Sequence, residues 1–470
     1  MSTVVGAESP VPAVRSAPRV VGLPPGPSSP SAVQTYRYVR DPLTLFDECS
    51  RRFGGMFTLN LLGTGNWVIV SSPALVKAML TAPADVVHAG EANLSVFGPV
   101  IGPGSVSVFT LDETPHLERR RLLLPQFHGD RMQVYFAQIR DIAAKAVSTW
   151  QPGLAFALHP RTQQMTLQAI IRAVFGIDSD RGEAEDRELV AALTALANDA
   201  VGSRLLLAPP LQRDLGAWSP WGRVVRIIRR ADEALLRAIA RRRTAPDVAE
   251  RQDILSLLLQ TSYDDGERLT DRQVRDELVV MLMAGHETTG TALAWAFERI
   301  LSLPEVEGRI RQELDAVVGP ESLSAAHLPR LEYLDAVIKE SMRTRPIMPI
   351  AAGRLVQRPF EIGGYVIPPG TTLAASGYLL HRRADLYPEP DAFKPERFLG
   401  KRVIDPYEWV PFGGGVRRCV GMAFALFEMK TILATVLSQA RLRIENPRAR
   451  VARRGFFLAP EHGPRVTLIS

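Results

Sequence analysis

The chain has 470 residues, of which 46% are hydrophobic and 23% charged, so it can bury a sizeable core and global disorder is excluded. Two cysteines are too few for a disulfide scaffold or a zinc-ribbon site. The 56 basic and 50 acidic residues give a net charge of +6, which could favour nucleic acid, an anionic surface or an acidic protein partner. Because no motif with interleaved aromatic residues is present, we expect an acidic partner and no nucleic acid.

Residues 1–22 contain charges and prolines without an apolar centre, which predicts a flexible tail rather than a signal peptide or membrane anchor. No stretch reaches about 18 uninterrupted apolar residues, so we expect no transmembrane helix and a cytoplasmic protein. Residues 23–470 are expected to form one domain that starts at an extended leader, Leu23-Pro24-Pro25-Gly26-Pro27.

The first third of this domain mixes helix and strand. The pattern predicts a helix over Asp41 to Phe53, a β-hairpin between Phe57 and Val70, and a helix from Pro73 to Thr81. Glycine and proline pairs then predict a long loop from Glu91 to Phe109. Loops of that length in compact domains are often functional.

Thr114 and Pro115 are predicted to cap and open the next helix, which runs through Arg121. His116 and Arg120 are four residues apart and therefore share one face of it. The spacing alone would also fit an ordinary solvated face, because charged residues surround both positions.

Residues 130–260 are predicted to be mostly helical, with proline-containing interruptions at Ala208-Pro209-Pro210 and at Trp218-Ser219-Pro220-Trp221. Thr270 and Gln273 then form a capping-box pattern. It starts a helix from Asp271 to about Ser302, roughly 45 Å long and enough to cross a domain.

The middle of this long helix reads Ala284-Gly285-His286-Glu287-Thr288-Thr289. A glycine, a carboxylate and two β-branched hydroxyl residues are locally unfavourable in a buried helix centre. Such a conflict between local preference and global pattern indicates a functional site.

Further helices are predicted over Pro304 to Val318 and over Pro329 to Arg345, followed by β structure between Gly353 and Ser376. Glu340 and Arg343, three residues apart in the second helix, can pair on one face, although this short motif is very common. No internal repeat and no glycine-rich fingerprint for a flavin or nicotinamide cofactor is found.

The most informative stretch is Pro411-Phe412-Gly413-Gly414-Gly415-Val416-Arg417-Arg418-Cys419-Val420-Gly421. Its three glycines let the backbone approach something bulky. Cys419 stands just before a predicted helix, whose free amides and dipole should favour a thiolate. A thiolate in a glycine cradle beside cations suits a soft metal ion within a large flat cofactor, whereas Cys49 is interpreted as an ordinary helix residue.

The spacing of Phe412, Gly415, Arg417, Cys419 and Gly421 resembles the haem-binding loop of the cytochrome P450 superfamily, and the chain resembles a soluble bacterial-type member. The resemblance extends from Leu23 to the C-terminus. It implies a mainly α triangular prism fold with a small β-rich lobe. It also implies haem b as the cofactor, packed beside Phe412, with Cys419 as the thiolate ligand of the iron.

The same resemblance assigns further cofactor contacts. Ala284 and Gly285 would leave room for the porphyrin and O₂ above the haem. The basic side chains implied to hold the haem propionates are His116, Arg120, Arg354 and Arg417.

Glu287 and Thr288 match the acid and alcohol that deliver protons in the family, and are the implied catalytic residues. Glu340, Arg343 and Arg397 match a buried charge triad. We interpret the triad as structural, bracing the cysteine loop, because a lone buried charge would be costly.

Three segments are implied to surround a substrate pocket. The loop between Glu91 and Phe109 would cover it, with Phe97 and Phe109 either contacting substrate or pinning the loop to the core. The proline-rich interruptions near residues 208–221 would form a mobile lid, or else an ordinary connection. A hairpin between Gly455 and Pro460 would reach the pocket with its tip.

The implied reaction inserts one oxygen atom of O₂ into a lipophilic small molecule, by hydroxylation or epoxidation of a fatty-acid, terpenoid, steroid or polyketide-like substrate. One alternative is a haem-thiolate peroxygenase, isomerase or dehydratase that does not use O₂, but such proteins often lack the acid–threonine pair that Glu287 and Thr288 match. A second is a haem sensor, which would usually carry an output module.

Two cysteines cannot hold a common iron–sulfur cluster. Electrons are therefore expected from a ferredoxin or flavodoxin with its NAD(P)H-dependent reductase. Such partners are typically acidic and would dock on the cysteine side. The cations predicted to receive them are Arg119, Arg121, Arg418 and Lys430.

Overall fold

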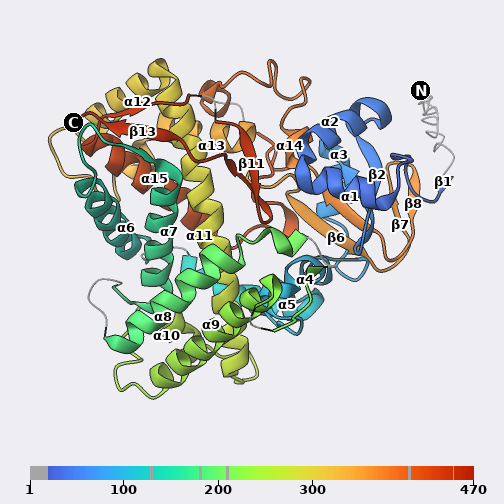
Figure 1. Cartoon of the computed structure of the whole chain (residues 1–470), viewed down its shortest axis with the longest axis horizontal. Coiled ribbons are helices and arrows are strands. Elements are labelled where there is room, and N and C mark those ends of the chain that lie inside the picture. The colour runs from blue at the N-terminus through green and yellow to red at the C-terminus, as the bar shows by residue number, and fades with distance from the viewer. Residues whose placement is uncertain are drawn as a thin grey trace, which may run out of the picture.

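The computed structural model describes residues 20–470 apart from 128, 130, 179–182, 208–210, 217, 401–403 and 448. The predicted tail therefore lies almost wholly outside the described residues, as does Ala208-Pro209-Pro210 of the predicted lid. A large helical body carries a smaller β-rich lobe at the end where the described chain begins (Figure 1). This arrangement confirms the predicted fold class.

The helices account for most of the regular structure. They are α1 (Ser31–Arg40), α2 (Pro42–Phe53), α3 (Pro73–Leu80), α4 (Ala89–Ile101), α5 (Glu113–Leu123), α6 (Arg131–Ser148), α7 (Leu158–Phe175), α8 (Ala184–Ala195), α9 (Pro220–Arg243), α10 (Ile254–Gln260), α11 (Asp271–Ser302), α12 (Pro304–Val317), α13 (Glu332–Thr344), α14 (Gly377–Leu380) and α15 (Met422–Gln439).

The strands are short. They are β1 (Val20–Val21), β2 (Met56–Leu61), β3 (Gly65–Val70), β4 (Val87–His88), β5 (Ala155–Ala157), β6 (Ala352–Val356), β7 (Phe360–Ile362), β8 (Tyr365–Ile367), β9 (Thr372–Ala375), β10 (Leu442–Ile444), β11 (Val451–Arg454), β12 (Phe457–Pro460) and β13 (Arg465–Leu468).

The β-rich lobe is built on a sheet in the order β2-β3-β9-β6-β4. β2 and β3 form the predicted antiparallel hairpin, with Phe57 opposite Ile69. β3 then pairs in parallel with β9, which brings Trp67 beside Thr372 from the far end of the chain. The leader lies along β2, where the amide of Thr58 donates to the carbonyl of Pro25.

The helical body is organised around α11, whose bounds and capping box are those predicted from the sequence. α7 crosses it closely at two glycines. A Cβ on Gly285 would lie 2.9 Å from Ile170, and one on Gly290 would lie 3.0 Å from the hydroxyl of Thr166. The local cost of glycine in the helix is therefore offset by a close approach of the two helices.

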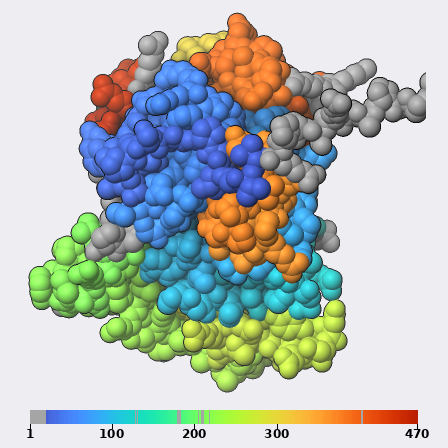
Figure 2. Space-filling model, turned by 90° about the vertical axis from the view of Figure 1, so that its right-hand side faces the viewer, coloured from blue at the N-terminus to red at the C-terminus, as the bar shows by residue number. Residues whose placement is uncertain are grey.

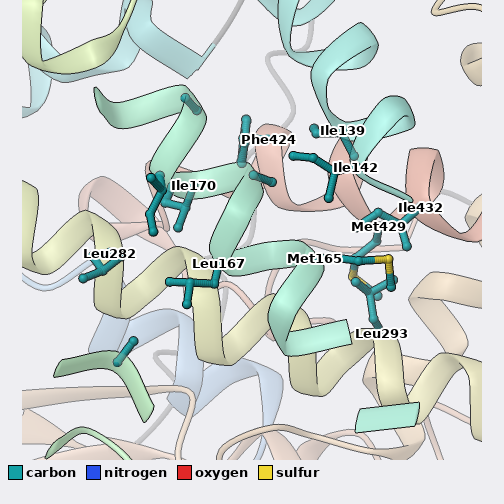
Figure 3. Packing of buried hydrophobic residues seen from close by; sticks show 14 of the residues in the cluster. Ile139, Ile142, Met165, Leu167, Ile170, Leu282, Leu293, Phe424, Met429 and Ile432 are labelled. Atoms are coloured by element: carbon teal, nitrogen blue, oxygen red, sulfur yellow. The ribbon is translucent and has the colours of Figure 1, made fainter. Parts of the chain in front are cut away.

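The core continues from this crossing to α6 and α15. Figure 3 shows Leu167 and Ile170 of α7 packed beside Leu282 of α11. Apolar side chains of α6 and α15 meet the same cluster, namely Ile139, Ile142, Phe424, Met429 and Ile432. Among the described helices α15 alone is long and apolar enough to span a membrane, but 56% of it is buried in the protein, which accounts for its composition.

Three predicted boundaries are wrong. The stretch predicted as a loop from Glu91 begins as helix α4, because the carboxylate of Asp112 accepts hydrogen bonds from the first amides of that helix, including Gly90 and Glu91. α5 starts at Glu113 after Asp112, so Thr114 is not its cap. α13 starts at Glu332, because a 3₁₀ turn precedes it.

The close crossing of α7 and α11 predicts that Gly290→Leu destabilises the fold by about 1–3 kcal/mol, because the added side chain would overlap Thr166 and Gln163. Gly308 is the matched control. It lies on the exposed face of α12 with no atom within 4 Å of a Cβ, so Gly308→Ala should stabilise by up to ~1 kcal/mol. Urea unfolding measures the stability of both variants. An unchanged unfolding midpoint for Gly290→Leu would show that the crossing of α7 and α11 tolerates a side chain.

Candidate haem site

The cysteine loop runs from Phe412 into α15 as a turn packed against the end of α3. The amide of Cys419 donates to the carbonyl of Phe412 at 3.0 Å. Gly413 and Gly415 have φ of 66° and 63°. A Cβ on Gly415 would lie 2.2 Å from the carbonyl of Leu80, so only glycine fits there.

The Cys419 side chain is accessible, although many protein atoms surround it. Burial raises the pKa of its thiol and outweighs the lowering by the amide of Gly421 and by the charges of Arg120 and Arg418. The amide at the helix end lowers this pKa, as predicted from the sequence, while burial raises it. A metal cation at the sulfur would favour the thiolate further. Cys49 is buried with a pKa of about 11, which fits its interpretation as an inert helix residue.

The middle of α11 exposes Ala284, although most residues around it are buried. Thr288 lies one turn further along and is partly exposed, and its hydroxyl donates to the carbonyl of Ala284. The two residues therefore line one accessible face of the helix. Gly285 instead faces Ile170 of α7, so the helix crossing alone already requires a glycine there.

The four basic residues predicted from sequence interact electrostatically in one region. His116 is buried, and its pKa falls to about 3 through burial and the charges of Arg417, Arg120 and Arg354. Burial also lowers the pKa of Arg354 and of Arg417 to about 10 each. Arg354 makes its hydrogen bond to the adjacent carbonyl of Gly353, and Arg120 binds the carbonyl of Arg418.

Asp112 is the acidic member of this group, and the sequence analysis missed it. Its carboxylate pairs with Arg417 while it caps α4. No local pattern identifies such a residue, because its partners come from two distant segments.

The net charge of these basic residues and Asp112 decides whether a haem could bind among them. The group holds three guanidinium groups and one carboxylate, and His116 is neutral at pH 7 because its pKa is about 3. Two positive charges remain unmatched in a largely buried region, which is unfavourable without counter-ions. The two propionates of a haem would supply two negative charges. Two further features fit a haem. Cys419 is a single accessible cysteine, and one face of α11 exposes Ala284.

Glu287 is buried beside this helix face, and burial raises its pKa. Gln163 of α7 donates to one carboxylate oxygen at 2.6 Å. The other oxygen has no hydrogen bond within the described part of the chain and lies 3.4 Å from Nε of Arg454 on β11. Gln163, Arg454 and the neighbouring His286 line a separate hollow of about 500 Å³ between α7 and α8.

Glu340, Arg343 and Arg397 also come together. Arg343 donates two hydrogen bonds to the Glu340 carboxylate at 2.7 and 2.8 Å, and both side chains are fully buried. Nε of Arg397 lies 3.4 Å from the same carboxylate, and the amide of Lys394 donates to it at 2.8 Å.

This group is connected to the cysteine loop through His381. Arg343 donates to the carbonyls of His381, Pro390 and Ala392. The ring of His381 accepts from the amide of Val410, just before Phe412. Burial and the charge of Arg343 lower the pKa of His381 to about 3, so the ring is neutral and can accept.

Two of the four predicted docking cations are wrong. Arg119 is buried and pairs with Glu277 at 2.7 Å. Arg119 stands three residues after His116 and four before Leu123, and this helical spacing could have revealed that it lies on the buried face. Lys430 is largely buried and pairs with Asp335 at 2.8 Å. Arg121 is exposed and Arg418 partly exposed, so these two remain candidates.

Three aromatic rings from distant segments meet near this region. The ring of Phe97 on α4 lies 5.3 Å from that of Phe109 and 4.4 Å from that of Phe456. Phe456 stands at the turn between β11 and β12, so the predicted hairpin is present. Both alternatives for Phe97 and Phe109 stay open, because rings that pin a loop can also face a ligand.

A helical fold with an accessible cysteine before a helix and a partly buried excess of cations defines a haem-thiolate protein. Residues 22–465 match the family model described as Cytochrome P450. The chain belongs to the cytochrome P450 family, whose members are haem-thiolate monooxygenases.

Relatives support this membership. A Mycobacterium tuberculosis protein named as cytochrome P450 135B1 is 38% identical over 90% of this chain and 86% of its own length. Another protein from the same organism, named as cytochrome P450 138, is 37% identical over 96% of this chain and 97% of its own length.

Solved structures share the fold. The retinoic acid bound cyanobacterial CYP120A1 has a TM-score of 0.81 at 22% identity, covering 95% of this chain and 99% of that one. The heme domain of cytochrome P450DA has a TM-score of 0.79 at 24% identity, and the match covers 96% of this chain and 98% of that one.

The buried pair predicts that Arg343→Met destabilises the protein by about 3–5 kcal/mol, because Glu340 would stay buried without its partner. Arg37→Met removes an ion pair with Glu48 at the surface and should cost at most ~1 kcal/mol. Urea unfolding and haem retention on a desalting column measure both variants. Equal stability and equal haem retention in the Arg343→Met and Arg37→Met variants would contradict a bracing role for the triad.

Proposed function

We propose that this protein uses haem b to insert one oxygen atom of O₂ into a lipophilic small molecule, with electrons from an external redox partner. The observation that carries the proposal is that α11 holds an accessible Thr288 hydroxyl next in sequence to a buried Glu287 of raised pKa. Haem-thiolate proteins that do not activate O₂ often lack this pair.

The proposed roles follow from the contacts. Cys419 would bind the iron, with Phe412 packed beside the haem. The propionates would lie among His116, Arg120, Arg354 and Arg417. When bound, the haem supplies the redox-active iron at which O₂ is activated, and the thiolate ligand favours O–O cleavage.

Proton delivery is proposed to run from the hollow beside α7 to Thr288. Gln163 and Arg454 line that hollow and hold the two oxygens of the Glu287 carboxylate. Because burial raises its pKa, Glu287 can take and release a proton closer to neutral pH than an exposed carboxylate. The Thr288 hydroxyl would pass the proton on from the accessible face of α11.

The substrate is proposed to be a fatty-acid, terpenoid, steroid or polyketide-like molecule. The apolar rings of Phe97, Phe109 and Phe456 offer a surface for such a molecule. A solved structure with the same fold is described as having retinoic acid bound, which supports a lipophilic substrate in this proposal.

Electrons are proposed to come from a ferredoxin or flavodoxin with its NAD(P)H-dependent reductase, in the cytoplasm. Arg121 and Arg418 remain as steering charges for an acidic partner, since Arg119 is buried and Lys430 largely buried in an ion pair, whereas the pair of Arg121 with Asp264 is exposed. The attraction should weaken as salt rises, because the screening length is about 8 Å at physiological ionic strength.

Turnover with labelled oxygen tests the proposed reaction. With ferredoxin, its reductase and NADPH, we expect one ¹⁸O atom from ¹⁸O₂ in a lipophilic product found by screening for shifts in the haem spectrum. Product labelled only from peroxide, or an unlabelled isomer, would favour the alternative enzymes. Reversible gas binding without any turnover would favour a sensor.

The ligand assignment predicts that Cys419→Ser abolishes the thiolate-type absorption of the reduced CO complex, because Cys419 is the accessible cysteine beside the cation cluster. Cys49→Ser is the matched control and should leave the band unchanged, because Cys49 is buried against the β-rich lobe. A thiolate-type band in folded Cys419→Ser protein would overturn the assignment.

The proton-delivery role predicts that Thr288→Ala keeps haem and substrate binding but diverts electrons from product to peroxide. The control is Thr289→Ala, one residue on and about 100° around the helix, at a buried position. The ratio of product to NADPH consumed should fall at least about tenfold for Thr288→Ala, within the usual effect of proton-transfer groups. Equal coupling in the two variants would remove Thr288 from the mechanism.

A further inference from the structure

The hollow beside Glu287 has the size of a ligand site. It measures about 500 Å³ and lies between α7 and α8, with His286 of α11 and Arg454 of β11 among the residues of its walls. Small-molecule sites in proteins usually measure about 300–1,000 Å³. Figure 1 shows α7 and α8 in the helical body, away from the β-rich lobe, whose blue and orange surface faces the viewer in Figure 2. The hollow therefore lies within the helical body and could hold a small molecule.

One face of α7 forms a continuous wall of this hollow. Five of its side chains recur at spacings of three and four residues, which keeps them on one side of the helix, namely Gln163, Gln164, Leu167, Gln168 and Ile171. A helix face that is turned toward a neighbouring helix is normally apolar. Because this face carries three glutamines, it suits contact with a partly polar molecule better than close packing against α8.

The opposite wall includes a π-helical turn, Leu196–Ala200, which follows α8 and carries Asn198. Such turns are rare and occur frequently at functional sites. The side-chain oxygen of Asn198 lies 3.4 Å from Nε2 of His286, which is buried. Burial and the charge of Arg454 lower the pKa of His286 to about 4, so its ring is neutral at pH 7. The polar groups on these two walls are therefore uncharged.

Among the described residues, Arg454 carries the only charge on the walls of the hollow, because none of the lining residues is an aspartate or a glutamate. Nε of Arg454 lies 3.4 Å from the Glu287 carboxylate, and its side chain is 34% exposed. The rest of its guanidinium makes no hydrogen bond with any residue that the structure describes. A guanidinium with a free edge matches the two oxygens of a carboxylate.

We propose that this space, here called the α7–α8 hollow, binds a small organic molecule that carries one carboxylate and an apolar body. The carboxylate would meet the free edge of Arg454, and the body would lie against Leu167, Ile171 and Val190 of the two facing helices. A single arginine matches one negative charge, so a molecule with several phosphates would keep most of its charge unpaired. A cation would be repelled by Arg454.

The α7–α8 hollow lies on the opposite side of α11 from the proposed oxygen-activating face. His286 lines the hollow, whereas Ala284 and Thr288 line the accessible face of the helix. At about 100° per residue, His286 lies about 160° around the helix from both of them. A ligand in the α7–α8 hollow should therefore leave the haem spectrum unchanged, which distinguishes it from a substrate beside the haem.

Calorimetric titration of the haem-loaded chain with 2-naphthoate and with 2-naphthamide tests the proposal. The two probes share one apolar body, and only the naphthoate carries a negative charge. We expect naphthoate to bind at least about tenfold more tightly, within the usual contribution of a hydrogen bond to a charged group, without any change in the haem spectrum. Equal affinities, no binding of naphthoate, or a spectral shift that follows its binding would overturn the proposal. Binding requires no turnover, so the result is independent of the proposed oxygen insertion.

A charge variant tests the part that Arg454 plays. Arg454→Gln should lose the preference for the acid, so that naphthoate and naphthamide bind alike. Arg453→Gln is the matched control, because it removes a charge from the preceding residue of β11, which does not line the α7–α8 hollow. It should keep the preference. A preference that survives in Arg454→Gln, or that is lost equally in both variants, would contradict the proposal.

A filling variant tests the location. Val190→Trp should occupy the α7–α8 hollow and abolish binding of both probes, whereas Ala191→Trp adds the same ring at the next, exposed position of α8 and should bind them normally. Unchanged binding by Val190→Trp would place the probes elsewhere and overturn the proposal. Haem content and the reduced CO spectrum check the folding of each variant. Where a variant fails to fold, the comparison of the two probes on the native chain still decides.

Discussion

The buried ion pair between Glu340 and Arg343 connects the cysteine loop to the helical body through His381. Arg343 satisfies the carboxylate with two donors and uses the rest of its guanidinium to hold carbonyls of the segment from residue 381 to 392. His381 then accepts from the amide of Val410 at the entrance of the loop. A charge pair of this kind gives little net stability, but removing one partner is costly, so it fixes one arrangement of three distant segments.

A second constraint is the surplus of positive charge around His116. Three guanidinium groups and one carboxylate in a largely buried region leave two charges unmatched, and burial accordingly lowers the pKa of Arg354 and Arg417. The fold is therefore built for an anionic cofactor, and binding that cofactor should stabilise the native state by mass action. The same reasoning explains why Asp112 serves both Arg417 and the start of α4, since it ties the cation cluster to the helix that covers it.

α11 presents two different sides to the rest of the molecule. Ala284 and Thr288 lie on its accessible face, whereas His286 borders the hollow between α7 and α8 and Glu287 lies between the two. The glycines that bring α7 close also place Gln163 against the Glu287 carboxylate. The packing of the two helices therefore also sets the position of Gln163, so a larger side chain at Gly290 would disturb both the crossing and the contact with Glu287.

The sequence by itself determined the elements whose signals are local. The capping box set the start of α11, the alternating pattern and its turn set the hairpin of β2 and β3, and the glycines around Cys419 set the loop before α15. Tertiary structure alone decided the role of Asp112 and the helical state of α4, because each depends on a partner far away in the chain. It also decided how far burial raises the pKa of the Cys419 thiol, since the surrounding residues come from distant parts of the chain. The physical reason is the same in each case: hydrogen bonds within a few residues can be read from spacing, whereas desolvation and long-range pairing exist only once the chain has folded.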